Sequence, residues 1–294
     1  MAPINTQLCT LLLALVSVLN HIAVVVDAFH LNNHEASRRN FLDDILIRGV
    51  GGGVITASAA GLVTVAHVPP APAAAAVAGE ELIDVYFGCG CFWHVMHEFV
   101  EAERRILNRS DDQLTARAGY AGGVAGALNG KVCYHNGKRV SDYGSLGHAE
   151  VVKLKIPPSS YKEFAIEYTK LFDKNGFRPD QSGDRGSEYR NLVGFPGGAK
   201  GQGGDVYFQQ LIEASKANGD KLGFVEGVGD DPDKAALVFV MDTTVYPSFV
   251  AEQYHQFHDG FAFGENYPRA YNDLAAQLSK EGTLGESNCP NGML

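Results

Sequence analysis

The stretch "VYFGCGCFWHVMHEF", residues 85–99, marks the point where a strand is expected to pass into a helix. The preceding residues "ELIDVYFG" (81–88) have the pattern of a buried strand that ends at glycines. The residues "FWHVMHEFVEAERRIL" (92–107) then place apolar side chains at helical spacing, with charged residues between them. Cys91 therefore falls at a predicted helix start, where backbone N–H groups and the helix dipole favour a thiolate.

Two other interpretations of this stretch stay open from the residues alone. A cysteine at this place can be a small buried apolar residue. Alternatively, Cys89, Cys91, His94 and His97 form the pattern C-x-C-x2-H-x2-H, and all four are possible zinc ligands. Structural zinc sites usually spread their ligand pairs over a longer loop, so this spacing is weak support for a metal-binding module.

The rest of the chain alternates between predicted strands and helices. Strands are expected over 148–156 and 235–243, helices over 160–172, 206–218 and 248–261, and a glycine-rich connection over 192–205. No internal repeat interrupts this order. A single α+β or α/β domain is the expected architecture.

The N-terminal part has the composition of targeting segments. The apolar, almost uncharged run at 8–26 predicts a signal peptide over 1–28. An arginine pair in "SRRNFLDDILIRG" (37–49) precedes a Gly/Ala-rich segment, which is similar to a twin-arginine export signal or to a flexible linker. We therefore expect a second targeting segment and linker over 29–78. Two stacked signals resemble those of plastid proteins of the thylakoid lumen; the alternative is secretion or another endomembrane compartment.

Charge and cysteine content narrow the classes of function. The chain has 34 acidic against 24 basic residues, a net charge of −10, which argues against a nucleic-acid partner. Five cysteines are too few and too scattered for a disulfide scaffold. Beyond the predicted signal, Cys89, Cys91, Cys133 and Cys289 remain to be explained.

Five motifs in order resemble the A-type peptide methionine sulfoxide reductases. They are "GCFW", "GYAGG" (119–123), "GHAEVV" (147–152), "GDRGSEYR" (183–190) and "YPSFVAEQYHQ" (246–256). The resemblance implies one α+β domain, a mixed sheet flanked by helices with a ferredoxin-like core, expected over 79–270. The small, polar residues near the C-terminus predict a mobile tail over 271–294. The resemblance also implies thiol-dependent reduction of methionine S-sulfoxide, free or in proteins. It implies no cofactor and no metal, and electrons from a thioredoxin-like donor.

The same resemblance assigns roles to individual residues. Cys91 is similar to the nucleophile, Glu150 to the general acid and Tyr189 to a hydroxyl donor. Asp184 resembles the carboxylate that orders the polar side of the site. Sulfoxide reduction needs such a set, because a thiolate attacks sulfur while the oxygen gains protons.

Other expected residues include Phe92 and Trp93, which resemble the apolar wall that receives the S-methyl group. A second oxygen-binding tyrosine is implied upstream of "GHAE", where Tyr134 and Tyr143 compete and Tyr134 is favoured. His94 replaces the family's usual glycine, so an altered pocket that serves as a non-catalytic redox sensor or binding domain is the alternative function.

The cysteine expected to resolve oxidised Cys91 is Cys289. It lies in a small, polar tail that is expected to be mobile enough to reach the pocket. Cys89 is close in sequence, but an extended chain separates it from Cys91 by about 6.6 Å, near the upper limit of disulfide geometry. Cys133 is a lesser rival.

Overall fold

The computed structural model describes residues 53–57, 63–67, 79–124, 130–136, 139–179, 183–259 and 267–289. The chain divides into two compact units, Met1–Pro72 and Ala73–Leu294. Among the described residues, no helix combines the length and apolar composition that crossing a bilayer requires.

The first unit contains two described strands. β1 (Gly53–Ala57) and β2 (Val63–His67) pair antiparallel, within the segment predicted as a second targeting signal and linker. The predicted signal peptide (1–28) and the arginine-containing segment (37–49) lie outside the described residues, so both stay predictions.

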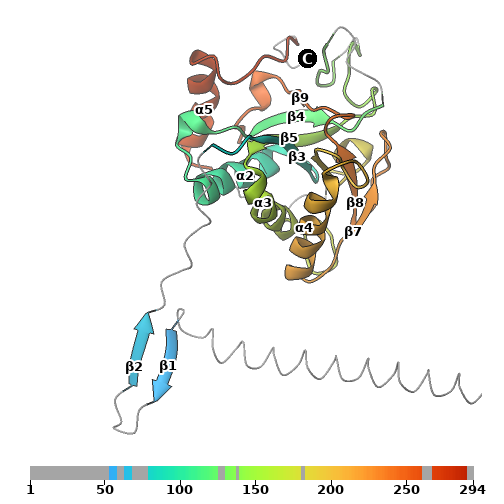
Figure 1. Cartoon of the computed structure of the whole chain (residues 1–294). Helices are drawn as coiled ribbons and strands as arrows, with labels where there is room; N and C mark the ends of the chain where they lie inside the picture. Colours follow the sequence, from blue (N-terminus) through green and yellow to red (C-terminus); the bar gives the residue numbers. More distant parts are fainter. Residues whose placement is uncertain are drawn as a thin grey trace, which may run out of the picture. The chain divides into compact units, whose positions relative to one another are not determined.

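The second unit holds a seven-stranded sheet. Its strands are Ile83–Gly88 (β3), Arg117–Ala121 (β4), Ala149–Ile156 (β5), Leu192–Phe195 (β6), Gly223–Glu226 (β7), Leu237–Asp242 (β8) and Phe249–Val250 (β9). The described helices of this unit are Phe92–Leu107 (α2), Tyr161–Lys170 (α3), Gly204–Ala217 (α4) and Arg269–Lys280 (α5). The strands lie in the order β7-β8-β6-β3-β5-β4-β9 (Figure 1).

The central four strands form a ferredoxin-like core. They pair antiparallel in the order β6-β3-β5-β4. In the chain, α2 lies between β3 and β4 and α3 between β5 and β6, which completes a β-α-β-β-α-β unit. β8 and β7 extend the sheet through parallel pairs, and β9 pairs with β4 at the other edge. The predicted α+β domain with a mixed sheet flanked by helices is confirmed.

Strand β3 is buried on both faces of the sheet. Val85 and Phe87 enter the main core, which is shared with the helices, whereas Tyr86 packs into a smaller cluster on the opposite face. Phe87 stacks on Phe99 of α2 with ring centroids 4.5 Å apart. Figure 1 shows α2, α3 and α4 gathered on one side of the sheet. Burial on both faces explains why "IDVYFG" lacks the polar alternation of a strand with one wet face.

Arg190 is fully buried beside the smaller cluster and joins three loops. Its guanidinium donates to the carbonyl oxygens of Gly122 (2.8 Å), Gly147 (3.0 Å) and Ser187 (2.6 Å). These carbonyls follow β4, precede β5 and begin the 3-10 turn Ser187–Tyr189 (η4). Because a buried guanidinium without these partners would be costly, the contacts fix the three segments relative to one another.

The helix predicted over 248–261 is wrong for the described part of that segment. Phe249–Val250 is strand β9, and Gln253–His255 is a single 3-10 turn (η5). The Gln256 side chain accepts from the Ala118 N–H and donates to the Ala118 carbonyl, both at 2.9 Å. Docking against the edge of β4 therefore overrides the helical spacing of the aromatic side chains.

The C-terminal segment is attached to the domain through α5. Tyr271, Leu274 and Leu278 are buried in the main core. Farther along, the Arg117 guanidinium donates to the Leu284 carbonyl at 3.0 Å. The predicted mobile tail over 271–294 therefore includes a packed helix, and the mobility of the residues after that helix stays a prediction.

Candidate active site

Cys91 lies where β3 passes into α2, in the place that the sequence predicts. It is the N-cap residue of α2, and the turn before it places Gly90 at φ 85°, a conformation that favours glycine. The Gly90 N–H donates to the Tyr189 carbonyl at 3.0 Å. The turn therefore brings Cys91 beside the η4 segment.

Glu150 is the second residue of β5 and is 2% exposed. Its Oε2 accepts from the Phe92 N–H, in the first turn of α2, at 3.0 Å. Its Oε1 accepts from the Tyr143 hydroxyl at 3.3 Å. β3 and β5 approach closely here because Gly88 has no side chain: a Cβ would collide with the Glu150 carbonyl oxygen. The carboxyl is thus fixed at the helix start that carries Cys91.

The pKa of the Glu150 carboxyl is raised to about 8, chiefly by burial. The hydrogen bonds from Phe92 and Tyr143 oppose this shift, and the negative charges of Asp184 and Glu188 add to it. At neutral pH the carboxyl is therefore mostly protonated. A protonated buried carboxyl beside a thiol is suited to donate a proton.

The pKa of the Cys91 thiol differs from the expectation. The helix start was predicted to favour the thiolate, but burial and the negative charge of Glu150 raise the pKa of Cys91. A backbone hydrogen bond from Trp93 acts in the predicted direction and is outweighed. Because protonation of Glu150 removes one of the two main opposing causes, the thiolate is most favoured when the neighbouring carboxyl holds its proton.

Tyr134 and Tyr143, the two competing tyrosines, both lie at the site. Their rings stack with centroids 5.7 Å apart. Burial, with the negative charges of Glu150 and the Cys91 thiolate, raises the pKa of Tyr134 to about 12. Tyr143 is fully buried and contacts Glu150 directly. Both hydroxyls are therefore neutral donors at neutral pH.

Tyr189 and Asp184 face the same site from the η4 side. Burial raises the pKa of Tyr189, and the charge of Glu150 adds to this effect. The pKa of Asp184 is also raised by burial, against the positive charge of Arg178. Arg178 donates to the backbone carbonyls of Tyr189 and of Asp184, the latter at 2.9 Å. One guanidinium thus orders both predicted residues.

The apolar wall contains Phe92 and Trp93, and His255 completes it. The His255 ring centroid lies 5.1 Å from that of Phe92, 6.0 Å from that of Trp93 and 4.4 Å from that of Tyr134. Burial lowers the pKa of His255 to about 4, so the ring is neutral and acts as an aromatic surface. His255 is not among the residues predicted from the sequence, although it lies in the motif "YPSFVAEQYHQ".

Glu252 is a second residue of the site that was not predicted from the sequence. Its carboxylate accepts from the Tyr134 backbone N–H and from the Tyr120 hydroxyl, both at 2.8 Å. Because Glu252 follows β9 and Tyr134 lies between β4 and β5, this contact positions Tyr134 from the edge of the sheet.

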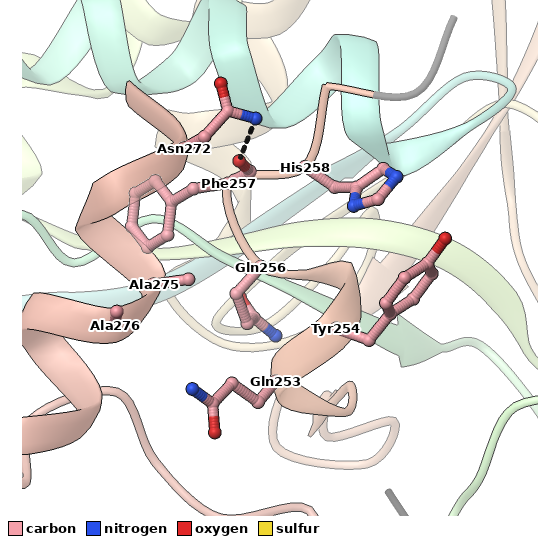
Figure 2. Close-up of a pocket in the computed structure, with 8 residues that line it drawn as sticks. All are labelled: Gln253, Tyr254, Gln256, Phe257, His258, Asn272, Ala275 and Ala276. Carbon is pink, nitrogen blue, oxygen red and sulfur yellow. Dashed lines mark hydrogen bonds between the residues drawn. The ribbon is translucent and has the colours of Figure 1, made fainter. Parts of the chain in front are cut away.

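An open cavity of about 460 Å³ lies between the segment after β9 and helix α5 (Figure 2). Tyr254 and His258 line it, and both rings contact Trp93, with centroids 6.2 and 4.1 Å from the indole. The Asn272 side chain donates to the Phe257 carbonyl at 3.5 Å and joins α5 to this segment. The cavity therefore adjoins the apolar wall.

The cysteines are arranged in an unexpected way. Cys133 and Cys289 form a disulfide with Cα atoms 5.7 Å apart, while Cys89 and Cys91 keep their thiols. Cys89 is buried, and burial raises the pKa of its thiol to about 12. Cys133 directly precedes Tyr134, so the disulfide lies next to a residue of the site. That Cys289 resolves Cys91 stays a prediction.

The four residues of the predicted zinc pattern, all of them described in the structure, do not form a cluster of possible metal ligands. Among the described residues, Cys133, Glu252 and Cys289 are the only group of three or more possible metal ligands whose ligand atoms lie within 4.8 Å of one another. Two of these three are joined in the disulfide. His97 instead contacts Glu98 at 3.2 Å and stacks on Tyr267.

Comparison with solved structures finds similar folds. Methionine sulfoxide reductase A of Corynebacterium diphtheriae is 19% identical, with a TM-score of 0.42, and the match covers 68% of this chain and 88% of that chain. Reduced Mxr1 from Saccharomyces cerevisiae is 20% identical, with a TM-score of 0.39, covering 64% and 92%. No family model and no curated protein matches the sequence. At these values the likeness by itself assigns no activity to this chain.

Proposed function

We propose that this protein reduces methionine S-sulfoxide, free or in proteins, to methionine. The observation that carries the proposal is the contact of Glu150 with the N-terminus of α2, one residue beyond Cys91. It joins a nucleophile to a buried carboxyl that is protonated at neutral pH. The motif order described above supports the substrate class, and the preference for the S epimer follows from that resemblance.

The polar side of the site supplies protons to the sulfoxide oxygen. The Cys91 thiolate attacks the sulfoxide sulfur, and Glu150 gives its proton to the departing oxygen. The hydroxyls of Tyr134 and Tyr189 donate hydrogen bonds to that oxygen. These bonds become stronger as negative charge develops on the oxygen in the transition state. The products are methionine and a sulfenic acid on Cys91, so two electrons pass from the thiol to the substrate.

The apolar side positions the substrate. Phe92, Trp93 and the neutral ring of His255 form a surface for the S-methyl group. A methyl group held there directs the sulfur towards Cys91 and the oxygen towards the hydroxyls. The arrangement favours one configuration at sulfur, because exchanging methyl and oxygen would place a polar atom against the aromatic rings.

Return of the enzyme to its reduced form requires a second thiol. We propose that the Cys289 thiol condenses with the sulfenic acid of Cys91 and releases water. Cys133 then displaces Cys91 from that disulfide, which gives the observed Cys133–Cys289 bond. A thioredoxin-like dithiol reduces this bond. The stacked signals predicted at the N-terminus support a plastid location, in the thylakoid lumen, with secretion or another endomembrane compartment as the alternative.

The test is turnover of the separated S and R epimers with dithiothreitol as reductant. The proposal expects methionine from the S epimer, with a strong preference over the R epimer, and loss of product in Cys91→Ser. No methionine from either epimer would contradict it. A change of the disulfide state without turnover would instead indicate the redox-sensor function.

A further inference from the structure

His135 is an ionisable residue that the proposed chemistry does not use. Its side chain is 44% exposed. Nδ1 lies 2.9 Å from Asp142 Oδ2, and Nε2 lies 3.1 Å from Glu188 Oε2. Both neighbours are carboxyl groups, so a protonated ring donates to both. His135 therefore connects solvent to Glu188, whose own side chain is 31% exposed.

Glu188 in turn shares the Tyr143 hydroxyl with Glu150. The Tyr143 oxygen lies 3.4 Å from Glu188 Oε2 and 3.3 Å from Glu150 Oε1. A hydroxyl has one proton and two lone pairs, so it can donate to one carboxyl while it accepts from the other, provided that the other is protonated. The Tyr143 ring is fully buried. The three contacts form an unbroken line from an exposed imidazole to a buried carboxyl.

We propose that His135, Glu188 and Tyr143 form a proton-transfer path that returns a proton from solvent to Glu150 after each reduction. The proposal rests on the proposed function, in which Glu150 gives its proton to the sulfoxide oxygen. Tyr143 then passes its proton to Glu150 and takes one from Glu188. Glu188 takes one from the His135 ring, which takes one from water or a buffer acid, so the net change is one proton moved inward.

The surroundings of Glu150 explain why a path is useful. Besides Glu188 and Tyr143 of the path, the titratable groups that face Glu150 are Cys91, Tyr120, Tyr134, Asp184 and Tyr189. With the carboxyl only 2% exposed, direct contact with solvent is slight. An ionised Glu150 also opposes the next attack, because its charge raises the pKa of Cys91.

Two features hold the path in place. The Asp142 carboxylate accepts from the Ser145 N–H at 2.9 Å, and this bond with the His135 contact lowers its pKa in spite of burial. Asp142 therefore stays ionised and orients the imidazole. Gly144 leaves room for Glu188, since a Cβ at Gly144 would overlap Glu188 Oε1.

A pH jump separates proton return from chemistry. Reduced enzyme is equilibrated at about pH 9.5, where a carboxyl with a pKa of about 8 is mostly ionised. It is then mixed rapidly with the S-sulfoxide at about pH 6.5, and methionine from the first turnover is measured. The reference is the same variant held at the lower pH throughout. Each variant is thus compared with itself, so general damage to the site cancels.

The variants are Glu188→Gln and His135→Ala, with Glu213→Gln as a matched control in a surface ion pair with Lys162. After the jump, we expect Glu188→Gln to form methionine about tenfold more slowly than without the jump. His135→Ala should show a smaller delay, because the Glu188 side chain is itself 31% exposed. The parent and Glu213→Gln should show no such difference. Because His135 is exposed, imidazole in the buffer should restore the rate of His135→Ala but not that of Glu188→Gln.

Gly144→Ala gives an independent test that changes no titratable group. It displaces the flexible end of Glu188 and should reproduce the delay of Glu188→Gln. The path is contradicted when the rates of Glu188→Gln and His135→Ala are the same with and without the jump, as direct protonation from the cleft would give. A parent that forms no methionine at all contradicts the proposed function instead.

Discussion

Cys91 and Glu150 belong to the sheet and helix of the ferredoxin-like core, whereas Tyr134, His135 and Tyr143 belong to the connection between β4 and β5. Main-chain ladders on both sides of β3 and β5 position the first pair. The described part of the connection has one isolated bridge, Cys133 to Asp142, and otherwise depends on turn hydrogen bonds, on the disulfide and on side-chain contacts. The nucleophile and acid are thus fixed by the fold, and Tyr134 and Tyr143 by a few separate contacts.

The largest expected effect is in the ferredoxin-like core, for Cys91→Ser. A hydroxyl is far less ionised and less nucleophilic than a thiol, so S-sulfoxide reduction should fall by roughly 10⁴-fold or more. Rapid-quench measurement of methionine in the first turnover checks this. Cys289→Ser, assayed in the same way, should keep its first-turnover rate; full activity in Cys91→Ser would remove Cys91 as the nucleophile.

The next effect is expected for Glu150→Gln, at about 10²–10⁴-fold in rate, because an amide cannot supply the proton. The acid works only when protonated, whereas ionisation of the Cys91 thiol increases with pH. The contribution of the acid, measured as the ratio of the parent's rate to that of Glu150→Gln, should therefore be full below the Glu150 pKa of about 8 and be lost as the pH rises through that value. Initial rates across pH 6 to 10 test this. A variant whose profile matched that of the parent would show that another group is the acid.

A smaller effect is expected in the connection between β4 and β5. Tyr134→Phe and Tyr143→Phe should each lower kcat/KM by about tenfold or more. The two should differ in pH dependence. The Tyr143 hydroxyl lowers the pKa of Glu150, so its loss should raise the pH at which the contribution of the acid is lost. Comparison of the two pH profiles therefore separates the roles of these tyrosines, and identical profiles would mean that Tyr143 does not contact the working acid.

The disulfide should matter more for stability than for the chemical step. It joins residues 156 apart, so Cys289→Ser should lower the free energy of unfolding of the oxidised protein by about 2–5 kcal/mol. Urea denaturation measures this, and reduced parent protein should then match the variant. Turnover with a thioredoxin-like donor should also be lost in Cys289→Ser, while unchanged cycling would assign resolution to Cys133 or Cys89.

The smallest effect is expected for His94→Gly. His94 lies on the first turn of α2. The pKa of Glu98, one turn further on, is lowered mainly by its hydrogen bond with His97, and His94 adds to this effect. Turnover should stay within about twofold of the parent, with a stability loss of about 1 kcal/mol from glycine in a helix. His94→Ala controls for that loss. A large fall in activity in both variants would place His94 in the site.

The ferredoxin-like core could be predicted well from the sequence, because the patterns that mark its strands and helices are local. The strand ending at Gly88 and the helix from Phe92 to Leu107 follow from burial and helical spacing. The contacts that position the connection between β4 and β5 join residues far apart in the sequence. Glu252 reaches Tyr134 across 118 positions of the chain, and no periodic pattern marks such a pair.

Two predictions made from the sequence were wrong for the same physical reason. The helix predicted over 248–261 failed because Gln256 and β9 dock on the edge of β4, which overrides helical spacing. The depressed thiol pKa expected for Cys91 failed because position along a helix predicts the dipole but not burial or the nearby carboxyl of Glu150. Both depend on neighbours that only the folded chain brings together.

The bond between Cys133 and Cys289 also makes the domain a covalent ring. More than half of the 294-residue chain lies between these cysteines, including the strands β5 to β9 and helices α3 to α5. A single protease cut inside the ring would leave one molecule under non-reducing conditions and two fragments after reduction. Gel electrophoresis of nicked protein would therefore report the redox state of this pair directly, without any assay of activity.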